Sequence, residues 1–502
     1  TFQVGDTLTI GDPLTVTGTL TIIDADDGGI QFGGTPVVGA LNLTDLNNIA
    51  ATNLELTTGA GIVVDGITQP VSITDQISLD AGTNILFTGS TSAFNSLDAR
   101  AQDGIAVDVN LTTVGDMTLD GDSNDLDDAN NNDEINFADG ITLNVGGALT
   151  LSATTGDLTA GDTLDLIVGD ALTLNDPLTL NPSGQLTIAD ADGGGIGIGG
   201  SPIPGGLNFA NVDLNKIDAG TLILDTAGNI VVGGVTQPST IDTITFNADG
   251  ANSVVTFQNL ASTFSTLNVN STAGVSIGSA VGSTGTVTID ADSNSDGTGD
   301  FAVTLTGSLN SGGNAISITA NDVILAGTVN AIGALVTLID SDQSGIGFGA
   351  TADLSGLNLS QSELNLIRST GLTLSTGGNI IVDGITQPNT LPGTVTLTAG
   401  TDIEFTGTAS SFDTLVAISS GGIQFTNLNA GLSATGSITL DGGVSGIGAL
   451  GSLSLTANDG VTISSSMTVA TNLTINADAD SNSIVSDNDG TLTISNGSIV
   501  ST

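Results

Sequence analysis

The chain has 502 residues, 3% aromatic residues and a formal net charge of −50, which comes from 53 acidic and three basic side chains. Three cations release almost no counterions from a phosphate backbone, so this composition disfavours nucleic acid and anionic membranes and favours cationic partners. Cys and His are absent, which excludes thiol chemistry and the commonest general base.

Short stretches with alternating apolar and polar residues follow one another from the first residues onward. Examples are "GTLTI" at 18–22 and "NIIVDGI" at 379–385, and Gly, Asn or Asp separates such stretches throughout. This period of two predicts strands with Leu, Ile and Val on one face. Strands that stack coil on coil need only short connections. We therefore predict an all-β fold, a right-handed parallel β-helix with short helical or loop excursions, at about 20–25 residues per coil.

One segment occurs three times, at residues 24–70, 190–238 and 340–388. A catalytic motif is normally present once in an active domain, so a copied segment indicates a repeated architecture. We divide the chain accordingly into a partial preceding repeat (1–23), three repeat units (24–189, 190–339 and 340–477) and the start of a further unit (478–502).

Each copy ends with the pentapeptide Gly-Ile/Val-Thr-Gln-Pro. We expect its aliphatic residue to point inward, its Gln to stack on or cap a coil corner, and its Pro to end the strand because proline has no N–H to donate. In chain order these residues are Ile67, Gln69 and Pro70, then Val235, Gln237 and Pro238, then Ile385, Gln387 and Pro388.

A short helical turn is predicted within each copy, at 43–49, 209–217 and 359–367, where β-branched residues are few and Leu recurs at helical spacing. Thr44 and Ser360 are the expected N-caps. The three turns should cover the side of the solenoid with Leu46, Leu214 and Leu364, and a ridge that binds a partner is the alternative interpretation.

The stretch "DADSNSDGTGD" at 290–300 contains the pattern Asp-x-Asn-x-Asp-Gly, the oxygen-rich half of a calcium loop. An EF-hand would place Glu where Val303 stands, so a calcium turn between strands is the closer comparison. A solvated acidic loop is the alternative. The predicted ligands are Asp290, Asp292, Asn294, Asp296 and Asp300.

Shorter acidic turns of the form Asp-x-Asp follow a strand at four other places. We interpret these Asp residues as closing the turns, and metal binding is the less favoured interpretation. The four pairs are Asp24 and Asp26, Asp190 and Asp192, Asp340 and Asp342, and Asp478 and Asp480. The densest acidic stretch, 120–137, is interpreted as an excursion that cations order.

The segment 357–388 resembles the repeat of large bacterial exoproteins of the filamentous haemagglutinin-like class. The residues that match the pattern are Leu359, Ser360, Glu363, Leu364, Ile367, Leu372, Leu374, Gly378, Ile380 and Val382. The resemblance implies a secreted β-helical shaft that takes part in adhesion, biofilm or cell-surface structure, and hence an extracellular or cell-surface location.

We therefore expect a non-catalytic, cation-stabilised structural shaft, with calcium as the expected cofactor. The alternative is a self-assembling filament or surface-layer subunit joined head to tail, which makes a homo-oligomer a candidate partner. A third interpretation, a β-helical polysaccharide-degrading enzyme, is disfavoured because the basic residues Arg100, Lys216 and Arg368 lie in different repeat units and no aromatic platform for sugar is present. No apolar run is long enough for a membrane span.

Overall fold

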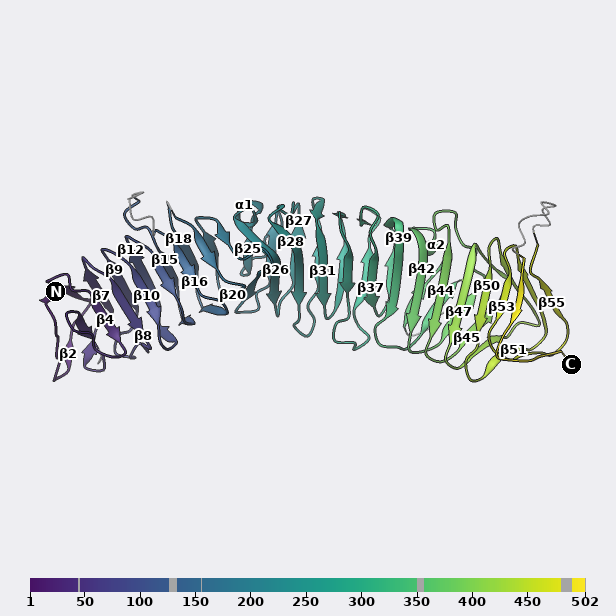
Figure 1. The fold of residues 1–502 in the computed structure, drawn as a ribbon, viewed down its shortest axis with the longest axis horizontal. Coiled ribbons are helices and arrows are strands. Elements are labelled where there is room, and N and C mark those ends of the chain that lie inside the picture. Colours follow the sequence, from purple (N-terminus) through teal and green to yellow (C-terminus); the bar gives the residue numbers. More distant parts are fainter. Residues whose placement is uncertain (44–45, 126–132, 155, 350–355, 480–489, 502) are drawn as a thin grey trace. The chain divides into compact units, whose positions relative to one another are not determined.

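A computed structural model describes the chain except for residues 44–45, 126–132, 155, 350–355, 480–489 and 502. The chain folds into two compact units, Thr1–Gly250 and Ala251–Thr502. Within each unit, short strands pair in parallel with the strands of the preceding and the following coil, as the successive arrows in Figure 1 show. The predicted all-β parallel β-helix with short helical excursions is confirmed.

Unit Thr1–Gly250 contains three long ladders and two small sheets. The first ladder runs through β1 (Phe2–Val4), β3 (Thr19–Asp24), β7 (Asn53–Thr58), β9 (Gln76–Ala81), β12 (Ser96–Ala101), β15 (Met117–Asp120), β18 (Leu149–Ser152) and β21 (Leu172–Leu174). The second runs through β5 (Leu41–Leu43), β4 (Ile30–Gly33), β8 (Ile62–Asp65), β10 (Ile85–Thr88), β13 (Ile105–Val107), β16 (Ile135–Phe137), β19 (Leu158–Ala160), β22 (Leu178–Thr179) and β26 (Ile217–Thr226). The third runs through β11 (Ser92–Phe94), β14 (Leu111–Thr113), β17 (Ile141–Val145), β20 (Thr163–Val168), β23 (Gln185–Asp190), β26 and β28 (Ile241–Ala248). The small sheets are β2 (Leu14–Thr15) with β6 (Ile49–Ala50), and β25 (Leu207–Phe209), β24 (Ile196–Gly199) and β27 (Ile230–Gly233).

Unit Ala251–Thr502 repeats this plan. Its longest ladder runs through β31 (Thr266–Ser271), β34 (Val287–Asp290), β37 (Ile316–Ala320), β39 (Thr328–Asp340), β42 (Ile367–Thr376), β44 (Thr394–Ala399), β47 (Thr414–Ser419), β50 (Ile438–Asp441), β53 (Val461–Ile463) and β56 (Leu492–Ile494). A second runs through β41 (Leu357–Leu359), β40 (Ile346–Gly349), β43 (Ile380–Asp383), β45 (Ile403–Thr406), β48 (Gly422–Phe425), β51 (Gly446–Ala449), β54 (Met467–Val469) and β57 (Ile499–Ser501). Shorter ladders join β29 (Val255–Phe257), β32 (Gly274–Ile277), β35 (Asp300–Val303) and β38 (Val323–Leu325); β30 (Ser262–Phe264), β33 (Ala280–Ser283), β36 (Ser308–Asn310) and β39; and β46 (Ser410–Phe412), β49 (Asn429–Ala434), β52 (Ser452–Ala457) and β55 (Leu473–Asn476).

The register of the ladders gives the length of each coil. Leu54 pairs with Ile77 and Ile77 with Leu97, so two successive coils contain 23 and 20 residues. Where a copied segment begins, the coil is longer: Leu186 pairs with Leu222, 36 residues later. The repeated segments are therefore coils that carry an insertion.

The insertion adds an extra strand to its coil in all three copies, and a helical turn in the second and third. The predicted turn at 43–49 of the first copy includes residues 44–45, which lie outside the described residues, and its described residues are not helical. In the second copy, β25 follows β24 in the chain but lies on the side of β24 that faces away from β27, so the chain steps back by one strand before it advances. The turns that follow β25 and β41 form α1 (Asn211–Leu214) and α2 (Gln361–Leu364). No helix among the described residues is long and apolar enough to cross a membrane.

The helical turns confirm two predictions made from the sequence. Ser360 caps α2: its hydroxyl accepts from the Glu363 N–H at 3.3 Å, while the Glu363 carboxylate accepts from the Ser360 N–H at 2.9 Å. The predicted cap Thr44 lies outside the described residues. Leu46, Leu214 and Leu364 are all buried, so these leucines cover the solenoid and do not form an exposed ridge.

The core of each unit is a stack of inward-facing aliphatic residues. In β42, Leu372 and Leu374 are fully buried, and they pair with Val395 and Leu397 of the next coil, which are also fully buried. Phe rings stack in the same way, and the Phe405 and Phe425 centroids lie 4.9 Å apart. Burial of such stacks contributes about 25 cal/mol per Å² of apolar surface, so the core stabilises the fold coil by coil.

The boundary between the two compact units lies inside the predicted repeat unit 190–339, between Gly250 and Ala251. Compactness in space and similarity along the sequence therefore divide the chain at different places. The five predicted segments describe similarity along the sequence, and they stay predictions.

Candidate cation-binding turns

The repeated pentapeptide forms a coil corner that its Gln ties together. Gln387 is nine-tenths buried, and its amide donates to the Leu391 and Gly393 carbonyls at 2.6 and 2.8 Å. Its carbonyl accepts from the Asp413 N–H of the next coil at 2.8 Å. Because one buried side chain satisfies three backbone groups in two coils, the Gln has a structural role.

The first copy has the same arrangement. The Gln69 amide donates to the Ile73 and Asp75 carbonyls, both at 2.9 Å, and its carbonyl accepts from the Asn95 N–H at 2.9 Å. The predicted capping of a coil corner by Gln is confirmed in both copies. The aliphatic residues of all three pentapeptides are buried, as predicted: Ile67, Val235 and Ile385.

In the three acidic turns that open the copied segments, the first Asp is buried and closes the turn. Asp340 is 2% exposed. Its Oδ2 atom accepts from the Gly345 N–H at 2.8 Å and from the Thr376 hydroxyl at 2.7 Å. Asp24 and Asp190 accept from the equivalent Gly and Thr residues at 2.7–2.9 Å. The interpretation as turn-closing is therefore confirmed for these three residues. In the fourth pair, Asp478 is exposed and Asp480 lies outside the described residues, so the interpretation stays a prediction there.

The second oxygen of the same carboxylates has a different environment. Oδ1 of Asp24, Asp190 and Asp340 is buried and has no hydrogen-bond partner. Burial, together with the neighbouring Asp342 carboxylate, raises the pKa of Asp340 to about 6. Burial also raises the pKa of Asp190, and Asp192 adds to the effect. Each of these two turns thus carries two acidic groups that repel each other when both are charged.

In the third copy, the preceding coil adds an amide oxygen next to the acidic pair. Asn321 follows Ala320, which pairs with Asp340, and its Oδ1 is buried without a hydrogen-bond partner. A methyl group built on Gly297 would lie 2.9 Å from Asp342 Oδ2 and 3.8 Å from Asn321 Oδ1. The two oxygens therefore border the same small space.

The loop predicted to bind calcium lies directly beside this turn. Asp292 is 1% exposed. It accepts from the Asp296 and Gly297 N–H groups at 3.2 and 3.1 Å, and from the Ser341 hydroxyl at 2.6 Å. Asp292 therefore organises the loop and joins it to the Asp340 turn.

The other predicted calcium ligands also take part in hydrogen bonds. Asn294 donates to Asp296 Oδ2 at 2.8 Å, and Asp296 Oδ1 accepts from the Thr298 hydroxyl at 2.6 Å, which lowers the pKa of Asp296. Asp290 Oδ1 accepts from the Asp292 N–H at 3.3 Å, and Asp300 Oδ1 accepts from the Asn321 amide at 3.1 Å.

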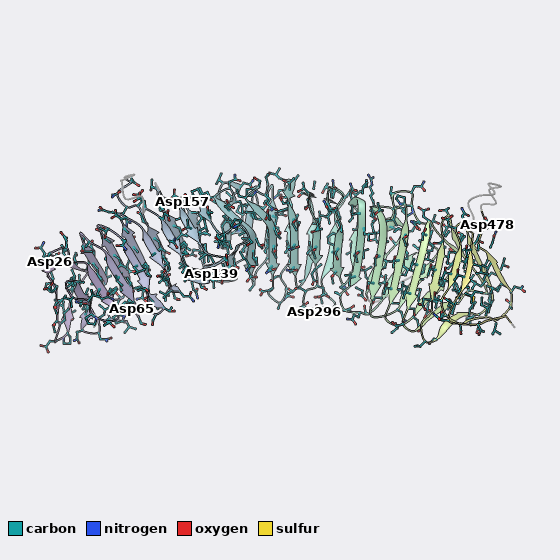
Figure 2. The ribbon with its side chains drawn as sticks, in the orientation of Figure 1. Asp26, Asp65, Asp139, Asp157, Asp296 and Asp478 are labelled. Carbon is teal, nitrogen blue, oxygen red and sulfur yellow. The ribbon has the colours of Figure 1, made fainter. Side chains whose placement is uncertain are left out.

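Among the described residues, no group of three or more Asp, Glu, His or Cys side chains is placed to hold a metal ion. Figure 2 labels two exposed acidic residues, Asp296 and Asp478, at the margins of the ribbon. Calcium binding by the five residues of the 290–300 loop stays a prediction.

Basic side chains compensate little of the acidity. Within the described residues, the single ion pair joins Arg100 Nε to Asp98 Oδ1 at 3.0 Å. Arg100 also pairs in the ladder with Asp80 on one side and Asp120 on the other. Burial nevertheless raises the pKa of both Asp80 and Asp120, so a single guanidinium does not offset their desolvation.

A groove of about 460 Å³ lies on the outer surface of unit Thr1–Gly250. Two carboxylates, Asp103 and Glu134, and two amides, Asn84 and Asn136, contribute to its lining. It is the place at which the polysaccharide-degrading alternative can be tested, because it combines two acids with groups that hydrogen-bond to hydroxyls.

The comparisons with known proteins leave the chain without a family. It matches no protein-family model, no curated protein and no solved structure. The parallel β-helix is compatible with the resemblance to haemagglutinin-like exoproteins, and both membership of that class and adhesion stay predictions.

Sequence reasoning missed Asn321 as a partner of the acidic turn. The information that identifies Asn321 is the length of this coil. Val336 pairs with Ile316, so the coil has 20 residues and Asn321 lies beside Ser341. Without the register, nothing marks Asn321 among the many Asn residues of the chain.

Proposed function

We propose that the chain is the structural shaft of an extracellular adhesin or cell-surface filament and has no catalytic role. One observation carries this proposal: the residues that are copied along the chain serve the fold. The repeated Gln ties coil corners, the repeated Asp closes turns and the repeated Leu fills the core. A chain that copies its structural residues gains length with each copy.

The outer surface fits the same proposal. Outward positions of the ladders carry Thr, Ser, Asn and Asp, and acids far outnumber bases, so like charges keep separate molecules apart. Stacked parallel coils leave few flexible loops for proteases. We infer extracellular location and adhesion from the resemblance of segment 357–388 to exoprotein repeats.

The shaft proposal is tested by resistance to proteolysis and by the absence of turnover. Purified chain should survive digestion by a broad-specificity protease for hours, and acidic polysaccharides should remain intact in its presence. If the purified chain depolymerises an acidic polysaccharide and the Asp103→Asn, Glu134→Gln double variant does not, the enzyme alternative would replace the shaft proposal.

Head-to-tail self-assembly is a second candidate function, because an open edge of a stacked ladder can pair with another coil. Leu492 and Ile494 pair with Val461 and Ile463, which are fully buried, but are themselves 46% exposed. A further coil, from the same chain or from a second copy, would bury them and continue the ladder. Sedimentation and electron microscopy should then show filaments that Leu492→Asp prevents, whereas monomers at all concentrations would exclude assembly.

Calcium binding by the 290–300 loop belongs to the same proposal, since a divalent cation would reduce repulsion among clustered carboxylates. Asp296→Asn should weaken calcium binding if the exposed part of the loop contributes a ligand. An unchanged unfolding midpoint after chelation would exclude a structural calcium ion.

A further inference from the structure

In each of the three acidic turns that open the copied segments, a buried carboxylate uses only one of its two oxygens in hydrogen bonds. In each of them, Oδ2 has two hydrogen-bond donors and Oδ1 has none, although the residue is more than nine-tenths buried. Buried polar atoms in proteins nearly always have a partner. The same unsatisfied atom at Asp24, Asp190 and Asp340 therefore leaves room for a shared proton or a bound cation beside each carboxylate.

A second carboxylate lies next to the unsatisfied one in every turn. Asp342 interacts with Asp340 through its side chain, Asp192 interacts in the same way with Asp190, and the first turn has the same pairing. No Lys or Arg among the described residues forms an ion pair with these turns, since the ion pair that those residues contain lies at Arg100. Two adjacent carboxylates without a basic partner repel each other, and a shared proton or a bound cation relieves that repulsion.

The Asp340 turn differs from the other two turns because a further side chain, Asn321, places an oxygen beside it. Asn321 Oδ1 is buried and unpartnered, and the Asn321 amide nitrogen is held by Asp300 at 3.1 Å, so the oxygen keeps a fixed direction. Asn321 Oδ1 and Asp342 Oδ2 border the same space beside Gly297. A proton needs only the two carboxylates, whereas an additional neutral oxygen is what a hard cation uses.

We propose that Asp340, Asp342 and Asn321 bind a hard divalent cation of the Ca²⁺ class. Asp340 would contribute its unpartnered Oδ1, Asp342 its Oδ2 and Asn321 its amide oxygen, and water would complete the coordination. Asp342 is partly exposed, which gives the ion a path from solvent.

The register explains why the site is confined to the third turn. Ala320 pairs with Asp340, so Asn321 is the next residue along the neighbouring coil. In the other two turns the equivalent positions are occupied by glycine, which offers no side-chain oxygen. The Asp190 turn is therefore a matched control within the same molecule. The pairs that define these positions are Val168 with Asp190, followed by Gly169, and Val4 with Asp24, followed by Gly5.

The test measures binding of Ca²⁺ to the full chain by equilibrium dialysis in about 0.15 M NaCl, which screens weak association with surface acids. Asp342→Asn and Asn321→Ala should each weaken the tightest Ca²⁺ site by at least the roughly tenfold that loss of a supporting residue causes. Asp192→Asn should leave that site unchanged. Far-UV circular dichroism establishes that each variant is folded.

Three results would overturn the proposal. The tightest site could persist in both Asp342→Asn and Asn321→Ala, or it could be lost equally in Asp192→Asn. Wild-type protein could also show an unfolding midpoint that Ca²⁺ does not raise, which would mean that the pair shares a proton. Asp296→Asn separates this site from the 290–300 loop, because the variant should retain the Asp340 site.

Discussion

The copied segments that begin at Asp190 and at Asp340 have the same framework but different surroundings. In both, a buried Asp accepts from a Gly N–H and from a Thr hydroxyl at 2.7–2.8 Å. The coil before the Asp190 segment places Gly169 beside the turn, and the coil before the Asp340 segment places Asn321 there. The comparison teaches that a repeat fixes a turn, while the neighbouring coil decides what that turn can bind.

The largest expected loss of stability should be the same in the two segments. Leu224→Ala and Leu374→Ala remove fully buried side chains from equivalent positions of β26 and β42. Each should lower the free energy of unfolding by about 2–5 kcal/mol, because a cavity remains in the core. Urea denaturation measures the loss, and the outward-facing Thr373→Ala, at about 0.5 kcal/mol or less, is the control. Clearly unequal losses at the two leucines would show that the frameworks differ.

A smaller loss is expected when the corner Gln is removed. Gln387→Ala leaves one buried and one partly buried carbonyl and one N–H without the Gln partner, which should cost about 1–3 kcal/mol. Gln361→Ala is the matched control, since Gln361 also makes hydrogen bonds to the Thr386 backbone, but at an exposed site. The same urea titration applies, and equal losses for the two variants would contradict a special role of burial at Gln387.

A pH titration sharpens the difference between the two acidic turns. The pKa of Asp340 is raised from 3.8 to about 6, so the folded state binds a proton in this interval that the unfolded state does not. With Ca²⁺ removed, the thermal unfolding midpoint should therefore rise as pH falls from about 6 towards 3.8. Asp340→Asn should reduce this rise, and Asp190→Asn should reduce it less. A midpoint that falls over this interval, or that responds equally to both substitutions, would contradict the comparison.

The smallest effect is expected at the proline that closes the segment. Pro238→Ala and Pro388→Ala relax a turn in which the proline carbonyl accepts from Ile241 or Leu391 at 3.2 or 2.9 Å. Alanine keeps that carbonyl, so each variant should lose at most about 1 kcal/mol through the greater freedom of the unfolded chain. Differential scanning calorimetry measures the shift. Loss of a specific ligand in either variant would instead assign the pentapeptide to a binding site.

Much of the fold was accessible from the sequence because a strand needs only a local pattern. Alternating apolar residues such as Leu372 and Leu374 identified the inward face, and the three copies indicated stacking. The pattern also located the helical turn and its cap at Ser360. The extra strands β5, β25 and β41 were not predicted, because their backward step depends on which strand is already paired.

Part of the candidate site was accessible in the same way. The Asp-x-Asp turns and the 290–300 loop were identified from their spacing, and Asp340 closes its turn as expected. What the spacing did not contain is the direction of each oxygen: Asp292 uses both of its oxygens within the protein, whereas Asp340 leaves one unpartnered. The two loop N–H groups reach different oxygens of Asp292, whereas both donors to Asp340 meet at Oδ2.

The sequence by itself determined the strand period, the three copied segments and the excess of carboxylates, since each of these is a property of neighbouring residues or of composition. The tertiary structure alone decided that Asn321 stands beside Asp340 and that Gly169 stands beside Asp190. The physical reason is the ladder register, which brings together residues one coil apart. A single shift in that register would pair each acidic turn with a different neighbour.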